Sequence, residues 1–195
     1  MTTLSRVRLK YNGLADVVGS DGMCVIMLTD EPATRCLNII CDKTMSQQLQ
    51  MRTGHLDICK CLLPEVLTAL LGDYVPVKKL EINIQGIFDG QYLVGLLNTD
   101  NYAIHQIRLS DAVLLHLIAD VPMYINEQLM KLQSTPYTEN QTKLSIPLNT
   151  LETEKLKEEL QRAIDNEDYR LASNIQEELN KREPFPLPPE TDQTS

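Results

Sequence analysis

The sequence predicts an α+β fold with a mixed, largely antiparallel sheet, flanking helices and a C-terminal α-helical hairpin. Two observations support this prediction. Strand-like segments come first, followed by two helices, a three-strand meander, a further helix and a last strand. Residues 151–182 instead repeat apolar side chains every three to four positions, as amphipathic helices do. The sequence has no glycine-rich phosphate loop, which argues against a doubly wound nucleotide fold.

The first apolar segments predict strands. Val7, Leu9 and Tyr11 alternate with polar residues, as expected of an edge strand. Residues 23–28 and 36–40 are apolar runs on either side of the turn-forming segment 29–34. They predict a strand, turn and strand unit.

Two helices should follow these strands. Asp42 is a suitable N-cap for a helix that ends near Gly54. Pro64 suits the first turn of a second helix, and Gly72 suits its end.

The next segments predict the meander and the last helix. Residues 80–84 and 92–96 alternate, and the Asp89-Gly90 pair between them favours a tight hairpin. A strand over 103–107, a helix over 111–119 capped by Ser110, and a strand over 123–125 that closes the sheet complete this part.

The C-terminal stripes predict two short helices that face each other. The first stripe is Leu156, Leu160, Ala163 and Ile164, and the second is Tyr169, Ala172, Ile175 and Leu179. Asn149 is the predicted cap of the first helix, with Glu152 at its third position, and Asp165 or Asn166 is the predicted cap of the second.

The length of 195 residues suits one domain with an appendage. We expect an α+β domain over 1–132, a linker over 133–150, the helical hairpin over 151–183, and a proline-rich, disordered tail over 184–195.

The composition predicts a cytoplasmic protein with no membrane span, because the chain lacks both a long apolar run and a signal peptide. The five cysteines are odd in number and lack C-x-x-C spacing, so we expect reduced thiols. Cys59 and Cys61 with His55 make a poor zinc site.

The net charge of −9 disfavours general adhesion to nucleic acid, so any such contact must be weak and local. Helices rich in Met and Leu predict apolar surface that a monomer of this size would struggle to cover. The chain is therefore expected to form a homo-oligomer.

The strongest polar cluster joins a strand end to a helix start. Arg108 ends a strand while Ser110 and Asp111 open a helix, which makes a corner suited to phosphate. Asp111 is also placed to hold a divalent cation such as Mg²⁺ or Mn²⁺. The alternative is purely structural, with Ser110 as cap and Arg108 paired with Asp111.

Residues 103–115 and 119–125 resemble the core of the bifunctional nuclease domain family, and the resemblance extends over about residues 5–130. It implies a metal-dependent nuclease that hydrolyses DNA or RNA. The residues it implicates in catalysis are Arg108, Ser110, Asp111 and Glu65, those in phosphate binding are Arg35, Lys60 and Arg108, and the metal ligand is Asp111. At 60–65 the family's usual His and Thr are absent, while Lys60 and Glu65 keep the charge types.

The hairpin resembles the UVR motif of excision-repair proteins through Glu167, Asp168, Tyr169 and Ala172. This implies a repair-related docking element that binds a protein partner. Its expected contacts are Tyr169, Ala172, Ile175 and Leu179. The alternative function is a non-catalytic adaptor or scaffold that works through this hairpin alone.

Overall fold

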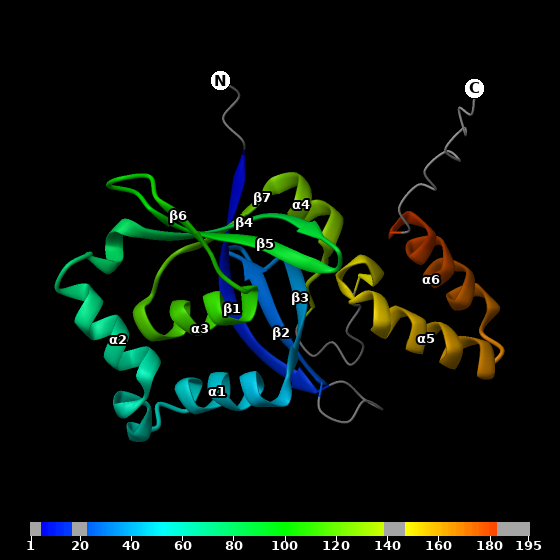
Figure 1. Cartoon of the computed structure of the whole chain (residues 1–195), viewed down its shortest axis with the longest axis horizontal. Helices are drawn as coiled ribbons and strands as arrows, with labels where there is room; N and C mark the ends of the chain where they lie inside the picture. The colour runs from blue at the N-terminus through cyan, green and yellow to red at the C-terminus, as the bar shows by residue number, and fades with distance from the viewer. Residues whose placement is uncertain (1–4, 17–22, 139–146, 183–195) are drawn as a thin grey trace, which may run out of the picture. The chain divides into compact units, whose positions relative to one another are not determined.

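The structure is a computed structural model that describes residues 5–16, 23–138 and 147–182 (Figure 1). It consists of two compact units, Met1–Thr150 and Leu151–Ser195. The first unit contains the sheet and the second contains a pair of helices.

The first unit is built on an eight-stranded sheet with the order β6-β5-β4-β7-β1-β2-β3-β8. Among the described residues every strand pairing is antiparallel except that of β4 with β7, which is the mixed α+β architecture expected. Its strands are β1 (Arg6–Asp16), β2 (Met23–Asp30), β3 (Arg35–Asp42), β4 (Leu80–Phe88), β5 (Gln91–Asn98), β6 (Ile104–Gln106), β7 (Met123–Asn126) and β8 (Ser134–Pro136).

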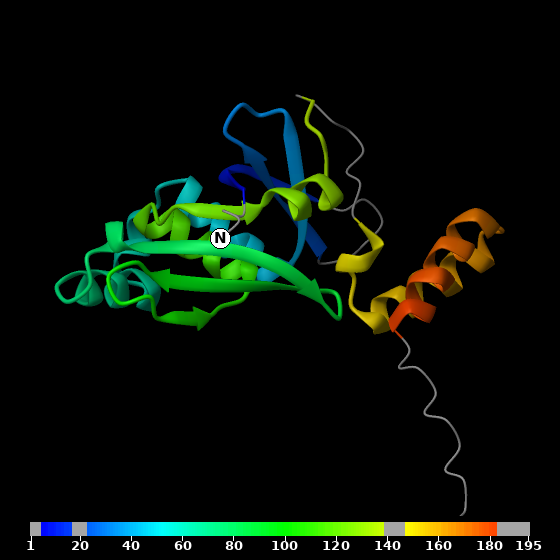
Figure 2. The same ribbon diagram turned by 90° about the horizontal axis from the view of Figure 1, so that it is seen from above.

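Strands β4 and β5 form an antiparallel hairpin, drawn in green in the turned view (Figure 2). Asp89 and Gly90 form its turn with φ values of 47° and 76°. A type I′ turn requires positive φ at both central residues, and the predicted Asp-Gly pair meets that requirement.

Two strands occupy positions that differ from the prediction. β1 is a central strand and not an edge strand, because β7 pairs with one side of it and β2 with the other. β7, predicted as the last strand that closes the sheet, lies in its interior between β4 and β1, since α3 (Leu109–Ala119) carries the chain back to a place beside β4, and β8 follows it in the chain. Alternation in a sequence gives the buried face of a strand but not its neighbours.

The segment predicted as a linker from residue 133 begins as part of the sheet. Asn126 caps an unpredicted helix, α4 (Glu127–Gln133), by accepting hydrogen bonds from the backbone of Gln128 and Leu129. β8 then pairs with the start of β3 as an edge strand. Residues 139–146 of that linker and the predicted tail 184–195 lie outside the described residues.

Helices α1 (Lys43–Thr53) and α3 lie side by side against one face of the sheet (Figure 1). The predicted cap is confirmed, since Asp42 Oδ1 accepts from the Met45 backbone at 2.7 Å. The other helical segments of this unit are η1 (Asp57–Cys61), α2 (Leu63–Gly72), η2 (Val77–Lys79) and η3 (Leu148–Thr150).

The core lies between these helices and the sheet. Its largest fully buried side chains include Leu9, Ile26, Leu28, Leu37, Leu49, Ile82, Ile84, Met123 and Ile125. Alternate residues of β2, β3, β4 and β7 supply it, because alternate side chains of a strand point to the same face of the sheet. On the opposite face, residues of β4 and β7 are exposed or half-buried, whereas residues of β2 and β3 such as Val25, Cys36 and Asn38 are buried there too.

The second unit is a pair of packed helices, α5 (Thr153–Asp165) and α6 (Tyr169–Arg182), as predicted. Its buried residues are Leu156, Ala163, Ala172 and Ile175. The predicted caps are wrong: Glu152 precedes α5, and Asp168 accepts from the Leu171 backbone at 3.1 Å at the start of α6. The first helix runs on through Asp165, which moves the second cap to Asp168.

All five cysteines are free, and only Cys61 is exposed. No helix within the described residues is long and apolar enough to cross a membrane.

Candidate functional site

The first predicted site residues meet at the start of α3. Arg108 Nε lies 2.7 Å from Asp111 Oδ2, and its Nη2 lies 3.2 Å from Asp111 Oδ1. The Arg108 side chain is nevertheless 76% exposed, so the two-point contact fixes its orientation while leaving it open to a ligand. We call this pair and its surroundings the α3 corner.

Ser110 is not the cap of α3, in contrast to the prediction. The helix begins one residue earlier, at Leu109, and Arg108 occupies the cap position without a capping side-chain hydrogen bond. Leu109 is buried in the core, and its burial draws that residue into the first turn. Ser110 therefore lies inside the helix and is half-buried.

The charge of the α3 corner is balanced locally. The hydrogen bond from Arg108 to Asp111 raises the pKa of the guanidinium, as does the attraction of the same carboxylate, and Asp42 adds a smaller attraction. Asp42 caps α1, so the starts of α1 and α3 contribute the carboxylates around Arg108. Arg108 therefore stays protonated throughout the accessible pH range.

A groove of about 290 Å³ lies beside Arg108. Phe88, the first half of β5, Gln106 and Ile107 line it with Arg108. The Phe88 side chain is 74% exposed, so an aromatic face and a guanidinium border the same groove. Such a combination suits a phosphate joined to a flat base.

The predicted metal ligand Asp111 does not belong to a cluster of three metal-binding side chains in the described part of the chain. Within residues 5–16, 23–138 and 147–182, no three His, Cys, Asp or Glu side chains gather in a group that could hold a metal. A protein-built metal cage does not fit there. The residues fit only the arrangement in which Mg²⁺ is held by one or two carboxylates and the phosphate oxygens of the substrate.

Glu65 lies in a buried ion pair away from the α3 corner. Its Oε2 accepts from Arg52 Nη2 at 2.8 Å, and its Oε1 lies 2.8 Å from Arg52 Nε. The second contact is an ion pair and not an aligned hydrogen bond. Arg52 belongs to α1 and Glu65 to α2, so this contact joins the two helices. It is shielded from solvent, because the Arg52 side chain is only 4% exposed.

The two remaining phosphate-binding candidates also have protein partners. Lys60 Nζ lies 2.8 Å from Asp57 in an exposed pair. Arg35 donates from Nε to Ser134 Oγ at 2.7 Å and from Nη2 to the carbonyl oxygens of Ser134 and Lys131 at 2.6 and 3.2 Å. Arg35 thus binds the carbonyl end of α4, as cations at helix C-termini do.

The predicted nuclease residues therefore do not converge on one surface. Asp42 is near enough to Arg108 for its charge to act on the guanidinium, and the eight-residue strand β3 separates Asp42 from Arg35. At about 3.3 Å per residue that separation is about 23 Å. Glu65 binds Arg52, which is ten residues along α1 from Asp42, or about 15 Å at 1.5 Å per residue.

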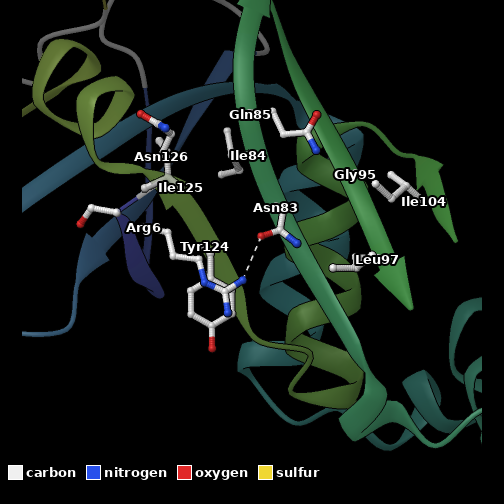
Figure 3. A pocket seen from close by; sticks show the side chains of 11 residues that line it. Arg6, Asn83, Ile84, Gln85, Gly95, Leu97, Ile104, Tyr124, Ile125 and Asn126 are labelled. Atoms are coloured by element: carbon white, nitrogen blue, oxygen red, sulfur yellow. Dashed lines mark hydrogen bonds between the residues drawn. The ribbon is translucent and has the colours of Figure 1, made fainter. Parts of the chain in front are cut away.

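A second concave site lies on the face of the sheet opposite to the core. This sheet-face pocket has a volume of about 410 Å³ and is lined mainly by β4, β5 and β7 together with Arg6 (Figure 3). The Arg6 guanidinium carbon lies 4.1 Å from the centre of the Tyr124 ring. Arg6 is also held by Glu81 at 2.6 Å and by Asn83 at 3.5 Å.

Amide side chains complete the polar lining of the sheet-face pocket. Asn83 and Gln85 project from β4 and Asn126 from the end of β7 (Figure 3). Sequence reasoning missed this site, although the polar members of the 80–84 alternation were visible. Those residues identify a solvent-facing row, but only strand order places them beside Arg6 and Tyr124.

The predicted partner contacts of the hairpin divide into two groups. Ala172 and Ile175 are buried between α5 and α6, and Leu179 is half-buried. Tyr169 is 70% exposed at the first position of α6. A partner therefore reaches Tyr169 directly, whereas Ile175 holds the two helices together.

The model of the bifunctional nuclease domain matches residues 25–138, more than half of the chain. The chain belongs to this family, and the α3 corner, Arg35, Lys60 and Glu65 all lie within the matched range. Arg6 and the hairpin lie outside it. Comparison with curated proteins gave no significant match.

Proposed function

We propose that the protein is a nuclease that hydrolyses phosphodiester bonds at the α3 corner. The observation that carries the proposal is the exposed Arg108, oriented by Asp111 at the entrance of a groove within the nuclease-family region. A guanidinium held in this way binds two phosphate oxygens and stabilises the negative charge that grows on them during hydrolysis.

In this proposal Arg108 binds the phosphate and Asp111 holds Arg108 in place. Asp111 is also the proposed ligand of a divalent cation, together with oxygens of the substrate. When bound, such a cation withdraws charge from the phosphate and lowers the pKa of a water molecule. Ser110, in the first turn of α3, adds its backbone to the positive end of the helix.

The sheet-face pocket is the proposed binding site for a base of a single strand. Gly95 lines this pocket and pairs with Gln106, which lines the groove beside Arg108, so both hollows are built on residues of β5 and β6. The Arg6–Tyr124 stack offers a flat surface, and the amides of Asn83 and Gln85 offer donors and acceptors. This contact is local, which agrees with the net charge of −9.

The test measures cleavage of single-stranded DNA and RNA oligonucleotides with Mg²⁺, Mn²⁺ or chelator. Arg108→Ala and Asp111→Asn should each reduce the rate at least about a hundredfold, the usual cost of losing a positioned charge. Arg162→Ala is the matched control, because Arg162 forms a similar exposed pair with Glu159 in the other unit, at 2.7 Å. Equal cleavage by wild type and Arg108→Ala, or full activity in chelator, would contradict the proposal.

The scatter of Arg35, Lys60 and Glu65 favours a second candidate, a non-catalytic adaptor that docks through the hairpin. Exposed Tyr169 is then the proposed partner contact, in the manner of a UVR motif. Tyr169→Asp should abolish capture of the partner from an extract of the producing cells, while Arg108→Ala should not. Tyr102→Asp is the control, since Tyr102 is similarly exposed (78%) on the sheet unit.

A further inference from the structure

The segment from Leu56 to Tyr74, which contains η1 and α2, exposes an unusual row of large apolar side chains. Its members are between 40% and 85% exposed: Leu56, Ile58, Leu63, Val66, Leu67, Leu70, Leu71 and Tyr74. We call this row the α2 face. Monomeric proteins rarely leave so many neighbouring apolar side chains in contact with water.

Helix α2 packs against its domain in the orientation opposite to that of an ordinary amphipathic helix. The five apolar residues from Leu63 to Leu71 fall at the i, i+3, i+4, i+7 and i+8 positions that normally face a core. No residue of α2 is buried, and the half-buried ones include Pro64, Glu65 and Thr68. The small and polar side therefore packs inward, and the leucine stripe faces solvent.

The part of the α2 face that helix α2 forms presents no charged side chain to solvent. The one ionisable residue of α2 is Glu65, and it is paired inward with Arg52. Copies of a chain with a net charge of −9 repel each other, but α2 adds no outward charge to this repulsion, and the exposed Asp57 and Lys60 of η1 pair with each other. A charged partner gains no complementary pair from this helix, whereas a second copy matches it apolar side to apolar side.

A hollow beside the α2 face provides space for side chains of that second copy. It has a volume of about 370 Å³ and lies between α2, the start of β4 and the end of α3. Leu71, Val75, Val77, Leu80 and Leu115 are among its mainly apolar lining residues. Tyr74 is 85% exposed and directly precedes Val75, which lines this hollow. In a dimer, the Tyr74 side chain of one copy is suited to enter the hollow of the other.

We propose that the α2 face is the interface of a homodimer with two-fold symmetry. A two-fold contact uses the same patch on both copies, and the leucine stripe of α2 can meet its own copy because the helix presents no outward charge. Full burial of one such side chain corresponds to about 60–120 Å² of apolar surface. Eight half-exposed side chains then supply about 400 Å² on each copy, half of the roughly 800 Å² of a standard interface. The hollow and its rim supply further area.

The test is the solution mass of the full chain at micromolar concentration, by sedimentation equilibrium. Wild type should have twice the monomer mass of 22.1 kDa, and the double variant Leu67→Glu, Leu70→Glu should have the monomer mass. Leu132→Glu is the matched control, because Leu132 is a 76% exposed leucine of α4 outside the α2 face, and it should stay dimeric. Far-UV circular dichroism checks that each variant is folded.

Two further variants keep the test decisive. If the charged double variant does not fold, Leu67→Gln with Leu70→Gln replaces it. Separately prepared Leu67→Lys and Leu67→Glu chains should be monomeric alone and should form a heterodimer when mixed, because a two-fold contact brings the α2 faces together. A monomeric wild type, a double variant that stays dimeric, or a Leu132→Glu chain that dissociates equally would overturn the proposal.

Discussion

Helices α1 and α2 are of similar length and follow each other along the chain, yet they use apolar residues in opposite ways. α1 is largely polar, but it buries Leu49 completely, together with Ser46 and Arg52. α2 consists mostly of leucine, valine and alanine, and it buries none of its residues. Hydrophobicity by itself therefore did not decide which helix entered the core.

The difference follows from how each helix is attached. α1 follows β3 directly and begins at the capping residue Asp42, so one side of it must lie on the sheet. α2 follows the short η1 segment and is tied to α1 by the Arg52–Glu65 ion pair, which lies on its polar side. That pair orients the leucine stripe of α2 away from the domain.

Truncation of one leucine in each helix should produce the largest difference in stability. Leu49→Ala should lower the free energy of unfolding by about 2–5 kcal/mol, because it leaves a cavity in the core. Leu70→Ala removes a 56% exposed side chain, and its effect should stay within about 0.5 kcal/mol. Urea denaturation at a protein concentration where wild type is monomeric measures both. Equal losses would mean that α2 is packed like α1.

The ion pair between the two helices should give the next largest effect. Glu65→Ala leaves the buried Arg52 charge unpaired, and the expected loss is about 3 kcal/mol. Asp57→Ala is the control, since it breaks the exposed Lys60 pair, for which a loss below about 1 kcal/mol is expected. Chemical denaturation of both variants measures the two losses in the free energy of unfolding. A Glu65→Ala chain as stable as Asp57→Ala would show that the pair does not hold α2 in place.

The hairpin allows the same comparison between a buried and an exposed apolar side chain. Ile175→Asp places a carboxylate at a fully buried position, so α5 and α6 should lose their helical structure. Tyr169→Asp changes a 70% exposed position and should leave both helices intact. Amide hydrogen exchange over residues 153–182 measures the outcome, with the sheet unit as internal reference. Protected amides in the Ile175→Asp chain would contradict this assignment of the hairpin core.

The smallest expected effect is on thiol reactivity, and it concerns η1, which joins α1 to α2. Cys61 is exposed while Cys59, two residues earlier, is 8% exposed. Burial raises the pKa of the Cys36 thiol to about 11 and that of Cys41 to about 12, so both remain protonated and unreactive at pH 8. A thiol reagent should therefore modify one cysteine of the native protein quickly, and none in Cys61→Ser. Rapid labelling of two or more would show that η1 opens readily.

The sequence alone was enough to predict the local features of this protein. The Asp42 cap, the Asp89-Gly90 turn, the β2–β3 unit and the pair of C-terminal helices each depend on residues close together in the chain. The pairing of Arg108 with Asp111 was also foreseen as an alternative, because three residues along a helix start bring the two side chains together.

Which distant segments became neighbours depended on the packing of the whole sheet unit. The insertion of β7 between β4 and β1 made β1 a central strand and placed Arg6 beside Tyr124 in a pocket that no local pattern describes. Packing likewise paired Glu65 with Arg52 and Arg35 with carbonyl oxygens at the end of α4, although Glu65 was predicted to be catalytic and Arg35 to bind phosphate. A charge in the sequence has many acceptable partners, and its burial and nearest neighbours select one. The outward orientation of α2 has the same origin, since its periodicity fixes a stripe but not the direction in which that stripe faces.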